Sequence, residues 1–517
     1  MKKQTQKLSI FDTTLRDGAQ TIGAHFHPDA KLQIAQQLIK LGVDTIEIGC
    51  PVASPQEFEV AKKAAKLFKK DKVNLAVFAR AKKIDIDKAW QSIKAHPRPI
   101  LSLLTSVSDV HLKAKFKKNQ KEMLKYFGQM INYGYKVGFK KIHVYLEDGT
   151  RTDFKYIKSL VAAFIDKGVS CISIPDTVGF VNDPEQYGML FSRLRNEIKI
   201  PKKVKLSSHT HNDKALAVAN ALAAIRHGVD QVECTINGLG ERAGNASLGA
   251  ILLNLYPNDI GKWSSLDYQV NTSINLSEYG KTAEMVGQLS GLGINYNEPL
   301  MGSTVFTTSA GIHQDGVIKD KNTYFCSDPE RFGISLKNKL LSFNMLSGLK
   351  GIVKILDGMG LQFDDELNKK IYQQVIVLAQ KKTPSIEDIR AIAMDIALEV
   401  EPIIEMRVCK NSSGVVPCTA EVVLFHRQKN KVLRGIGYGD GPFAAFMDIT
   451  CELLKLKATI LDYHDTVVGV GRDSQMQCFI KSSIQDQVYY GRGVSTDIVQ
   501  AGCRAFLKCV NEHLSGK

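Results

Sequence analysis

A repeated unit organises the first half of the chain and limits the possible folds more than any other feature. Each copy has a short β-rich run, a polar turn and an amphipathic stretch with helical spacing. Strands that alternate with helices are typical of parallel βαβ units. We expect eight strands, near Leu8–Asp12, Thr45–Gly49, Val73–Ala79, Ile100–Thr105, Lys141–Glu147, Cys171–Asp176, Val204–His209 and Gln231–Asn237. Helical patterns lie between them, among others at Asp29–Leu41, Pro55–Lys69, Phe154–Lys167, Asp183–Asn196 and Lys214–His227.

The number of repeats predicts an α/β fold built on a closed barrel. Eight units over about 250 residues match the strand count and size of a (β/α)8 TIM barrel. A doubly wound open sheet is the alternative that the same alternation allows. Polar side chains collect at the carboxyl ends of the expected strands, where barrel enzymes place their active sites. These groups are Asp12, Arg16, Asp17, Glu47, Arg80, Glu147, Asp148, Asp176, Thr177, His209, His211, Asn237 and Glu241.

The pattern changes after the barrel and predicts two further domains. We assign the barrel to residues 1–260 and helical linker subdomains to residues 261–400. Residues 401–517 contain three strands and a helix twice in succession, an approximate α+β duplication. No cluster of catalytic residue types occurs there, so we expect a regulatory and dimerisation domain. The glycines at 435, 437, 439 and 441 match no dinucleotide fingerprint and favour a structural turn, with Pro442 opening the next helix.

Composition excludes several classes of protein. The chain has 517 residues, and no apolar run approaches the roughly 18–20 residues that a membrane helix needs. The apolar run in its basic N-terminal segment is too short for a signal peptide. Ten cysteines form no CxxC pair, which favours reduced thiols in the cytoplasm over disulfides or a zinc ribbon. The net charge of +15 permits nucleic-acid binding, but no nucleic-acid-binding motif accompanies it. We therefore interpret the lysines as a solvated surface that favours encounter with an anionic substrate.

The pair His209-x-His211 is the strongest local signal for a metal site. Residues two apart on a strand project to one face, so both imidazoles can reach one ion. Asp17 adds a carboxylate, because the first and seventh strands both neighbour the eighth in a closed barrel. Asn245, in GLGERAGN, offers a further oxygen ligand. Histidines satisfied in the core or facing solvent are the alternative, and the added carboxylate favours a divalent ion such as Mn²⁺, Mg²⁺, Zn²⁺ or Co²⁺.

Four more side chains indicate what such a metal site does. The ion would chelate a 2-oxo acid, and Arg16 would add positive charge beside the ketone oxygen, unless it forms a structural ion pair. Glu147, in VYLEDG, is the candidate for acid–base work or else a partner of Arg16. Thr177, in IPDTVG, offers a hydroxyl to a substrate carboxylate, with helix capping as the alternative. His313, in SAGIHQDGV, has by itself the setting of a loop histidine.

Six motifs, spread over nearly the whole chain, are long enough to be specific. They are FDTTLRDGAQ at Phe11–Gln20, GVDTIEIGCPVASPQEF at Gly42–Phe58, SSHTHND at Ser207–Asp213, INGLGERAGNASLGA at Ile236–Ala250, SAGIHQDGV at Ser309–Val317 and GRGVSTDI at Gly491–Ile498. Together they resemble the acetyl-CoA-dependent 2-oxo acid condensing family, which includes 2-isopropylmalate, citramalate and homocitrate synthases. GRGVSTDI is similar to the end of 2-isopropylmalate synthases that carry a regulatory domain.

The resemblance implies a metal site and an assembly. Asp17, His209 and His211 match the metal ligands of the family, and Asn245 matches a further ligand. Acetyl-CoA is implied as co-substrate and a homodimer as the assembly. The C-terminal domain is implied to bind an amino-acid end product as a feedback inhibitor.

The resemblance also implies roles around the metal. Arg16 and Glu147 match the catalytic pair, and Thr177 matches the hydroxyl that holds the 2-oxo acid. His313 matches a histidine that reaches into the neighbouring subunit's barrel, and Tyr324 matches a tyrosine that does likewise. This implication reverses the interpretation of His313 as an ordinary loop residue.

The expected substrate pocket departs from the 2-isopropylmalate synthase pattern at three positions. Ser102 stands where a histidine is common, Tyr145 where a small serine is found, and Ser173 where an asparagine is usual. We predict an acyltransferase that condenses acetyl-CoA with 2-oxoisovalerate for leucine biosynthesis. A citramalate synthase that uses pyruvate is the alternative, because Tyr145 narrows the space for a branched side chain. An acyl-CoA lyase on the same barrel is disfavoured, because such lyases usually lack the extra ~250 residues beyond a barrel of ordinary size.

Overall fold

A computed structural model of the chain forms two compact units. The residues that it describes are 5–257, 269–308, 310–335, 348–380, 384, 386–397, 402–412, 417–468 and 475–516. The first unit comprises residues 1–306 and 325–337, and the second comprises residues 307–324 and 338–517. Each unit is considered by itself.

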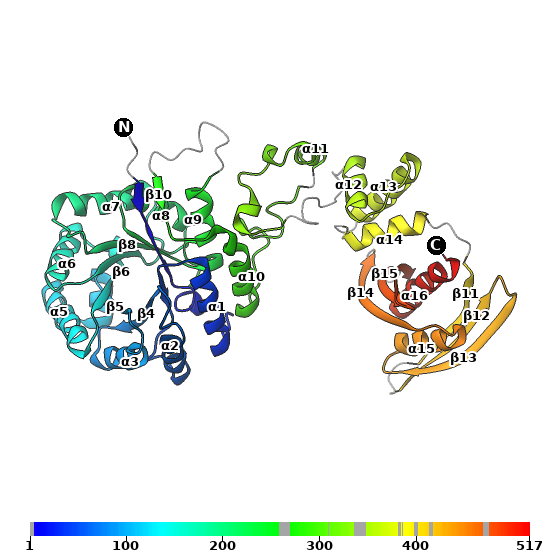
Figure 1. Cartoon of the computed structure of the whole chain (residues 1–517), viewed down its shortest axis with the longest axis horizontal. Helices are drawn as coiled ribbons and strands as arrows, with labels where there is room; N and C mark the ends of the chain where they lie inside the picture. The colour runs from blue at the N-terminus through cyan, green and yellow to red at the C-terminus, as the bar shows by residue number, and fades with distance from the viewer. Residues whose placement is uncertain are drawn as a thin grey trace. The chain divides into compact units, whose positions relative to one another are not determined.

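Eight parallel strands close into a barrel in the first unit (Figure 1). Each strand pairs with the next in chain order, and the last returns to pair with the first. This closure confirms the TIM barrel and excludes the open sheet. The strands are β2 (Ser9–Asp12), β3 (Thr45–Glu47), β4 (Asn74–Arg80), β5 (Pro99–Ser106), β6 (Lys141–Glu147), β7 (Cys171–Asp176), β8 (Lys205–Thr210) and β9 (Gln231–Cys234).

Helices cover the outside of the barrel. They are α1 (Pro28–Leu41), α2 (Pro55–Leu67), α3 (Lys83–Ile93), α5 (Gln120–Val137), α6 (Phe154–Asp166), α7 (Pro184–Glu197), α8 (Ala217–Arg226) and α9 (Leu248–Leu255). Short helical turns lie in the loops: η1 (Gly18–Gln20), α4 (Asp109–His111), η2 (Leu112–Phe116), η3 (Gly149–Arg151) and η4 (Ile236–Gly238). Ser54 and Asp183 cap α2 and α7, and a proline follows each as the first helical residue. Helix α8 begins later than predicted, because Ala215 has a φ of 59°.

The eighth strand is shorter than predicted. It ends at Cys234, and the chain turns at η4, where Asn237 has a φ of 57°. A left-handed residue cannot continue a strand, and asparagine is one of the few that adopt this conformation readily. The side chain of Asn237 then donates a hydrogen bond to the carbonyl of Ala283 at 2.9 Å.

The interior of the barrel carries polar side chains as well as apolar ones. Phe11 of β2 meets His143 of β6 edge to face across the barrel, with ring centroids 5.1 Å apart. In neighbouring strands Ser102 lies beside His143 and Tyr145 beside Ser173. Side chains two apart on a strand share a face, so these positions all point inward.

Further elements of the first unit pack beside the barrel. Strand β1 (Thr5–Lys7) pairs in parallel with β10 (Gln269–Asn271). They are followed by η5 (Leu276–Glu278) and α10 (Tyr279–Ser290), and later in the chain by η7 (Pro329–Phe332). Gln37 of α1 donates hydrogen bonds to Glu278 and Thr282, which joins α10 to the barrel.

The second unit begins with helices, in keeping with the helical character predicted for residues 261–400. These are α11 (Gly311–Lys319), η6 (Lys321–Thr323), α12 (Leu349–Gly358), α13 (Asp365–Ala379) and α14 (Ile386–Ala397). Ile352, Ile371 and Ile389 lie in a shared apolar cluster of α12, α13 and α14. These helices therefore have a small core of their own.

The C-terminal part contains the predicted duplication of three strands and a helix. The first copy is β11 (Ile404–Asn411), β12 (Cys418–His426), β13 (Lys431–Gly439) and α15 (Pro442–Leu454). The second copy is β14 (Ala458–Val468), β15 (Gln475–Ile484), β16 (Gln487–Ser495) and α16 (Ile498–Ser515). Each copy forms a three-stranded antiparallel sheet, and the two copies share one apolar core.

The prediction of a turn at the glycine series is wrong for three of its members. Gly435, Gly437 and Gly439 lie within β13. A Cβ atom at Gly437 would lie 2.7 Å from the Cβ of Ile449, so these glycines let α15 pack closely on the strand. Pro442 is the first residue of α15, as predicted.

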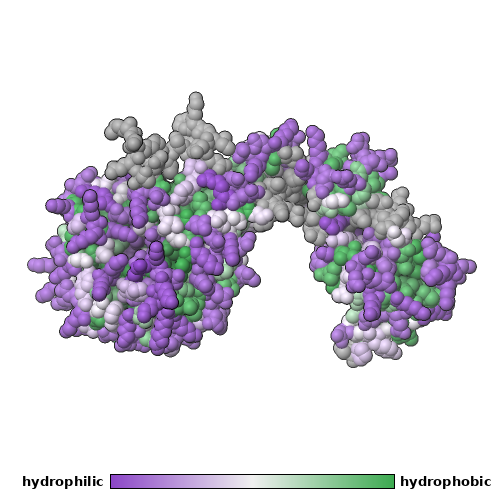
Figure 2. Space-filling model, in the orientation of Figure 1, coloured by the Kyte–Doolittle hydropathy of each residue, from purple (hydrophilic) through white to green (hydrophobic). Residues whose placement is uncertain are grey.

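The outer surface of the barrel is mainly hydrophilic where Figure 2 shows it, as the many charged residues in the composition lead us to expect. On the face drawn in Figure 2, hydrophilic residues predominate on the outer helices of the barrel. Among the described helices, none combines the length and the apolar character needed to cross a membrane.

Candidate active site

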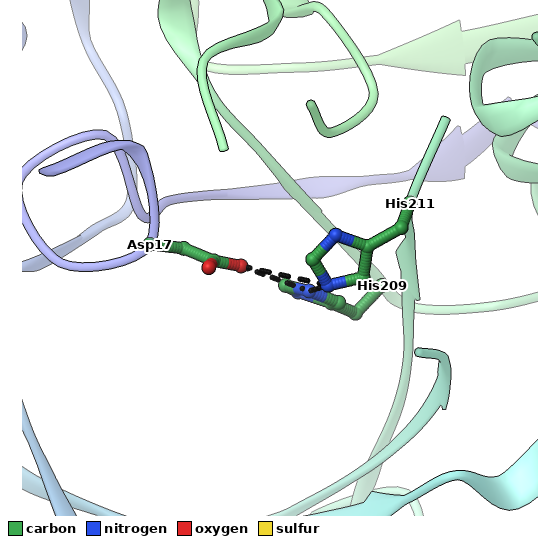
Figure 3. A group of neighbouring side chains, drawn as sticks. All are labelled: Asp17, His209 and His211. Atoms are coloured by element: carbon green, nitrogen blue, oxygen red, sulfur yellow. Dashed lines mark hydrogen bonds and ion pairs between the residues drawn. The ribbon is translucent and has the colours of Figure 1, made fainter. Parts of the chain in front are cut away.

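Three potential metal ligands, distant in sequence, meet at the carboxyl-terminal mouth of the barrel. Asp17 lies in the loop after β2, and His209 and His211 lie at the end of β8. Oδ2 of Asp17 is 3.2 Å from Nε2 of His209 and 3.8 Å from Nε2 of His211. The two Nε2 atoms are 3.2 Å apart. All three residues are buried, and Figure 3 shows the carboxylate pointing toward both rings. The structure therefore brings the predicted triad together.

Asn245 joins this cluster through its side-chain amide. Its Nδ2 donates to Oδ2 of Asp17 at 2.8 Å, whereas its buried Oδ1 has no hydrogen-bond partner among the described residues. The backbone of Asn245 forms an antiparallel bridge with His211, which holds the loop against the end of β8. Gly240 leaves room for the amide, because a Cβ atom there would lie 2.7 Å from Cγ of Asn245. A buried, unpaired amide oxygen is suited to act as an additional ligand.

The protonation of the cluster is uneven. Burial opposes the charged form of Asp17, but Arg16 and His209 outweigh it and hold its pKa well below the usual value. Burial also opposes a charged His209, but hydrogen bonds to Asp17 and Glu233 raise its pKa to about 9. Burial and the neighbouring charge of His209 lower the pKa of His211 to about 3. Without a cation, His209 thus carries the positive charge, between the carboxylates of Asp17 and Glu233.

The donor set fits a divalent cation. Two Nε2 atoms 3.2 Å apart cannot face each other with bare lone pairs, so a proton or a cation has to lie between them. Two imidazoles, one carboxylate and one amide oxygen are the ligand types that Mn²⁺, Zn²⁺ and similar ions accept. The residues present therefore suit the predicted metal.

Arg16 is held beside this cluster by a carboxylate to which the sequence assigned no role. Its Nε donates to Oε2 of Glu47 at 2.6 Å, and one of its terminal nitrogens lies 3.4 Å from Asp17. The guanidinium also covers the ring of Phe78 at 4.8 Å. Burial alone would lower the pKa of Arg16, but Asp17 and Glu47 outweigh it and raise the pKa well above the usual value. The alternative pairing of Arg16 with Glu147 is not seen, because Glu47 and Asp17 take that place.

Glu147 ends β6 and faces a different set of partners. It accepts a hydrogen bond from the hydroxyl of Ser106. Nζ of Lys115 lies 3.0 Å from its Oε1, and Nδ1 of His111 lies 3.4 Å from its Oε2. Glu147 thus lies at the barrel mouth as predicted, with its charge balanced from the α4–η2 segment.

The residues that we expect to line the substrate pocket differ in their hydrogen bonding. The hydroxyls of Ser102 and Ser173 are buried and have no hydrogen-bond partner among the described residues. Tyr145 donates to Oε1 of Glu47 at 3.2 Å. The hydroxyl of Thr177 accepts from the backbone N–H of Asp148 at 2.9 Å. Thr177 is therefore not a helix cap, since Asp183 caps the helix that follows.

His313 and Tyr324 belong to the second unit. His313 lies in helix α11 rather than in a loop, and Tyr324 lies just after η6. Their rings are neighbours, with centroids 4.2 Å apart and an interplanar angle of 34°. Both side chains are exposed. The two residues therefore form one exposed aromatic pair.

Sequence reasoning assigned no role to three buried residues of the site, although it placed Glu47 at the barrel mouth. Glu47 holds Arg16, Glu233 lies beside His209, and His143 lies beside Glu233 in the interior of the barrel. A signal was present in the sequence. Glu233 stands in the strand QVEC, and a charged residue in a strand buried on both faces needs a partner.

Comparisons with known proteins agree with these features. A family model described as HMGL-like matches residues 7–286, one described as homocitrate synthase post-HMGL domain-like matches residues 300–383, and one described as LeuA allosteric (dimerisation) domain matches residues 385–514. The 2-isopropylmalate synthase of Dictyoglomus turgidum is 35% identical over 98% of both chains. The 2-isopropylmalate synthase of Bacillus licheniformis is 35% identical over 98% of this chain and 96% of its own. This chain belongs to the 2-isopropylmalate synthase family.

Membership of this family has direct consequences. The chain is an acyltransferase-type enzyme, and the family implies a divalent metal ion and acetyl-CoA. The match to the LeuA domain supports a dimer that binds a regulatory ligand. Both relatives share one name, so the citramalate alternative is not favoured.

Among solved structures, an HMG-CoA lyase from Bacillus subtilis aligns at 20% identity with a TM-score of 0.47, over 57% of this chain and 97% of its own.

Proposed function

We propose that the barrel condenses acetyl-CoA with 2-oxoisovalerate and water to give 2-isopropylmalate and free CoA, the step that commits carbon to leucine. The observation that carries this proposal is the buried cluster of Asp17, His209 and His211 with Arg16 beside it at the barrel mouth. The full-length similarity to 2-isopropylmalate synthases supports the choice of substrates.

Asp17, His209, His211 and Asn245 are the residues that would hold the metal. When bound, a divalent ion supplies Lewis-acid polarisation of the keto and carboxylate oxygens of the 2-oxo acid. Asp17, His209 and His211 are buried, and their ligand atoms all lie within 4.8 Å of one another.

Arg16 stabilises the negative charge that develops on the ketone oxygen when the acetyl carbanion attacks. It suits this role because Glu47 and Asp17 fix its position and its charge. Thr177 and the free hydroxyls of Ser102 and Ser173 are assigned to the 2-oxo acid, with Tyr145 bounding the space for its side chain.

Glu147 is assigned the acid–base work. It lies at the end of β6, two residues beyond Tyr145 and on the same face of the strand. His313 and Tyr324, which lie together in the second unit, are assigned to the barrel of the partner subunit. This assignment makes a homodimer necessary for a complete site.

We also propose that three parts of the chain have different functions. Residues 1–260 form the catalytic barrel, residues 261–400 form linker subdomains that serve the partner's site, and residues 401–517 bind an amino-acid feedback inhibitor. Ten free cysteines and the absence of a spanning helix among the described residues support a place in the cytoplasm.

The test is CoA-thiol release from acetyl-CoA with Mn²⁺ or Mg²⁺ present, using 2-oxoisovalerate, pyruvate and 2-oxoglutarate in parallel. We expect the highest kcat/KM with 2-oxoisovalerate and no release after chelation of the metal. A preference for pyruvate would overturn the substrate assignment and make Tyr145 the gate. Release that continues after chelation would overturn the metal assignment.

A further inference from the structure

A buried carboxylate with no role in the proposed reaction lies on the inner side of the metal cluster. Glu233 of β9 is 1% exposed. Its Oε2 lies 3.0 Å from Nδ1 of His209, and its Oε1 accepts a hydrogen bond from Ser207 at 2.8 Å. Nε2 of His143 lies 3.1 Å from the same Oε1, at ion-pair distance but without hydrogen-bond alignment. Three groups thus surround one carboxylate in the barrel interior.

This arrangement is fixed from several sides. A buried carboxylate is costly unless it is paired and hydrogen-bonded, so Glu233 depends on these partners. His143 reaches it from β6, and the imidazole is itself held between the stacked ring of Tyr145 at 4.8 Å and the edge of Phe11 at 5.1 Å. The contacts join β6, β8 and β9, and they leave Glu233 little freedom to move.

The two histidines of the cluster differ in the partners of their Nδ1 atoms. Nδ1 of His209 faces Glu233, whereas Nδ1 of His211 is buried without a hydrogen-bond partner among the described residues. His211 is held instead by the backbone bridge to Asn245. A carboxylate or carbonyl behind a ligating histidine fixes its tautomer and its ring orientation. Only one of the two histidines has such a carboxylate.

We propose that Glu233 is a positioning residue for the metal site: it accepts the Nδ1 proton of His209, so that Nε2 presents its lone pair toward Asp17 and His211. His143 and Ser207 hold the carboxylate in place for this purpose. The inference rests on the proposed function, because it takes the Asp17–His209–His211 cluster as the metal site. It adds a residue that sets metal affinity without touching the metal.

The test compares Glu233→Gln with a matched control that lies just before the same strand. Asp230→Asn makes the same carboxylate-to-amide change just before β9, at the opposite end of the barrel, where Asp230 accepts hydrogen bonds from Leu206 N and Arg195. Mn²⁺ affinity of the full-length, metal-free chain is measured by calorimetric titration. We expect Glu233→Gln to weaken Mn²⁺ binding about 10–100-fold, the usual range for such a partner, and Asp230→Asn to leave it unchanged.

The outcomes separate this inference from the function on which it rests. If the unsubstituted chain does not bind Mn²⁺, both are overturned. If it binds Mn²⁺ and Glu233→Gln binds equally well, only the positioning role is overturned. A lower melting temperature with unchanged Mn²⁺ affinity would likewise reduce Glu233 to a structural residue and overturn the proposal.

Two further measurements cover a variant that fails to fold. Ser207→Ala removes the hydrogen bond to Oε1 and the longer one that Ser207 accepts from Gln231 at 3.3 Å. It keeps the charges of Glu233 and His143, and we expect about fivefold weaker Mn²⁺ binding. The visible absorption of bound Co²⁺ reports the geometry of its ligands. We expect this spectrum to change in Ser207→Ala and to stay unchanged in Asp230→Asn. If Ser207→Ala matches the unsubstituted chain in affinity and spectrum, the proposal is overturned.

Discussion

Replacing Glu47 by glutamine tests whether Arg16 needs a fixed carboxylate. Glu47 is fully buried, and it accepts hydrogen bonds from Arg16 at 2.6 Å, Thr13 at 2.7 Å and Tyr145 at 3.2 Å. Glutamine has nearly the same shape but lacks the charge, and it offers one acceptor oxygen instead of two. Arg16 would then keep only one ion pair, the longer contact with Asp17 at 3.4 Å.

The size of the effect follows from these contacts. Breaking a buried ion pair by removing one partner costs about 3–5 kcal/mol. The amide keeps one acceptor, so we take the lower end, about 3 kcal/mol, for the loss of stability. At about 2–4 °C per kcal/mol, the melting temperature should fall by about 6–12 °C. Loss of one preorganised donor to a developing oxyanion lowers kcat by about 10²–10³-fold, which we expect for a displaced Arg16.

The assay is CoA release at saturating acetyl-CoA and metal, together with thermal unfolding. Asp44→Asn is the control: Asp44 lies at the opposite end of the barrel, just before β3, where it accepts from the backbone of Ile10 at 2.8 Å. We expect this control to lower stability without lowering kcat, since that end of a barrel serves stability. A kcat for Glu47→Gln within threefold of the unsubstituted enzyme would refute the reasoning.

Three further predictions concern other parts of the chain. His211→Ala should abolish metal-dependent turnover and lower the bound metal found by elemental analysis; full activity in this variant would contradict the metal assignment. Tyr145→Ser should raise kcat/KM for branched 2-oxo acids relative to pyruvate by about 10–150-fold, because a few methylenes are worth about 1–3 kcal/mol of binding energy. An unchanged ratio would show that Tyr145 does not bound the pocket. Deleting residues 401–517, which keeps α14 in the apolar cluster that it shares with α12 and α13, should abolish amino-acid inhibition of CoA release. Persisting inhibition would place the effector site elsewhere.

The barrel could be predicted from the sequence because its buried strands and the starts of its helices each leave a local signal in the sequence. Strands buried on both faces appear as short β-rich runs, and capped helices such as the one after Ser54 show their starts. The cluster of candidate metal ligands could be predicted from two geometric facts: alternation places His209 and His211 on one face, and closure brings the first strand to the last. These facts needed no knowledge of side-chain conformation.

The partner of Arg16 could not be predicted in the same way. Both Glu47 and Glu147 end strands at the barrel mouth, so position along the strand does not separate them. What separates them is the α4–η2 segment, which brings His111 and Lys115 to Glu147. That segment belongs to the irregular connection after β5. Sequence periodicity does not predict where the side chains of such a connection reach.

The buried carboxylates give the site a common logic. Glu47 holds Arg16, and Glu233 holds His209, so each of two groups that we propose to face the substrate or the metal has a carboxylate behind it. Both carboxylates are within 1% of complete burial, where charge interactions are strong and water does not compete. Groups fixed before the reaction need no reorganisation during it, which is the main source of electrostatic catalysis. For this reason we expect Glu47→Gln to lower kcat at saturating metal, and Glu233→Gln to lower metal affinity while kcat at saturating metal is largely kept.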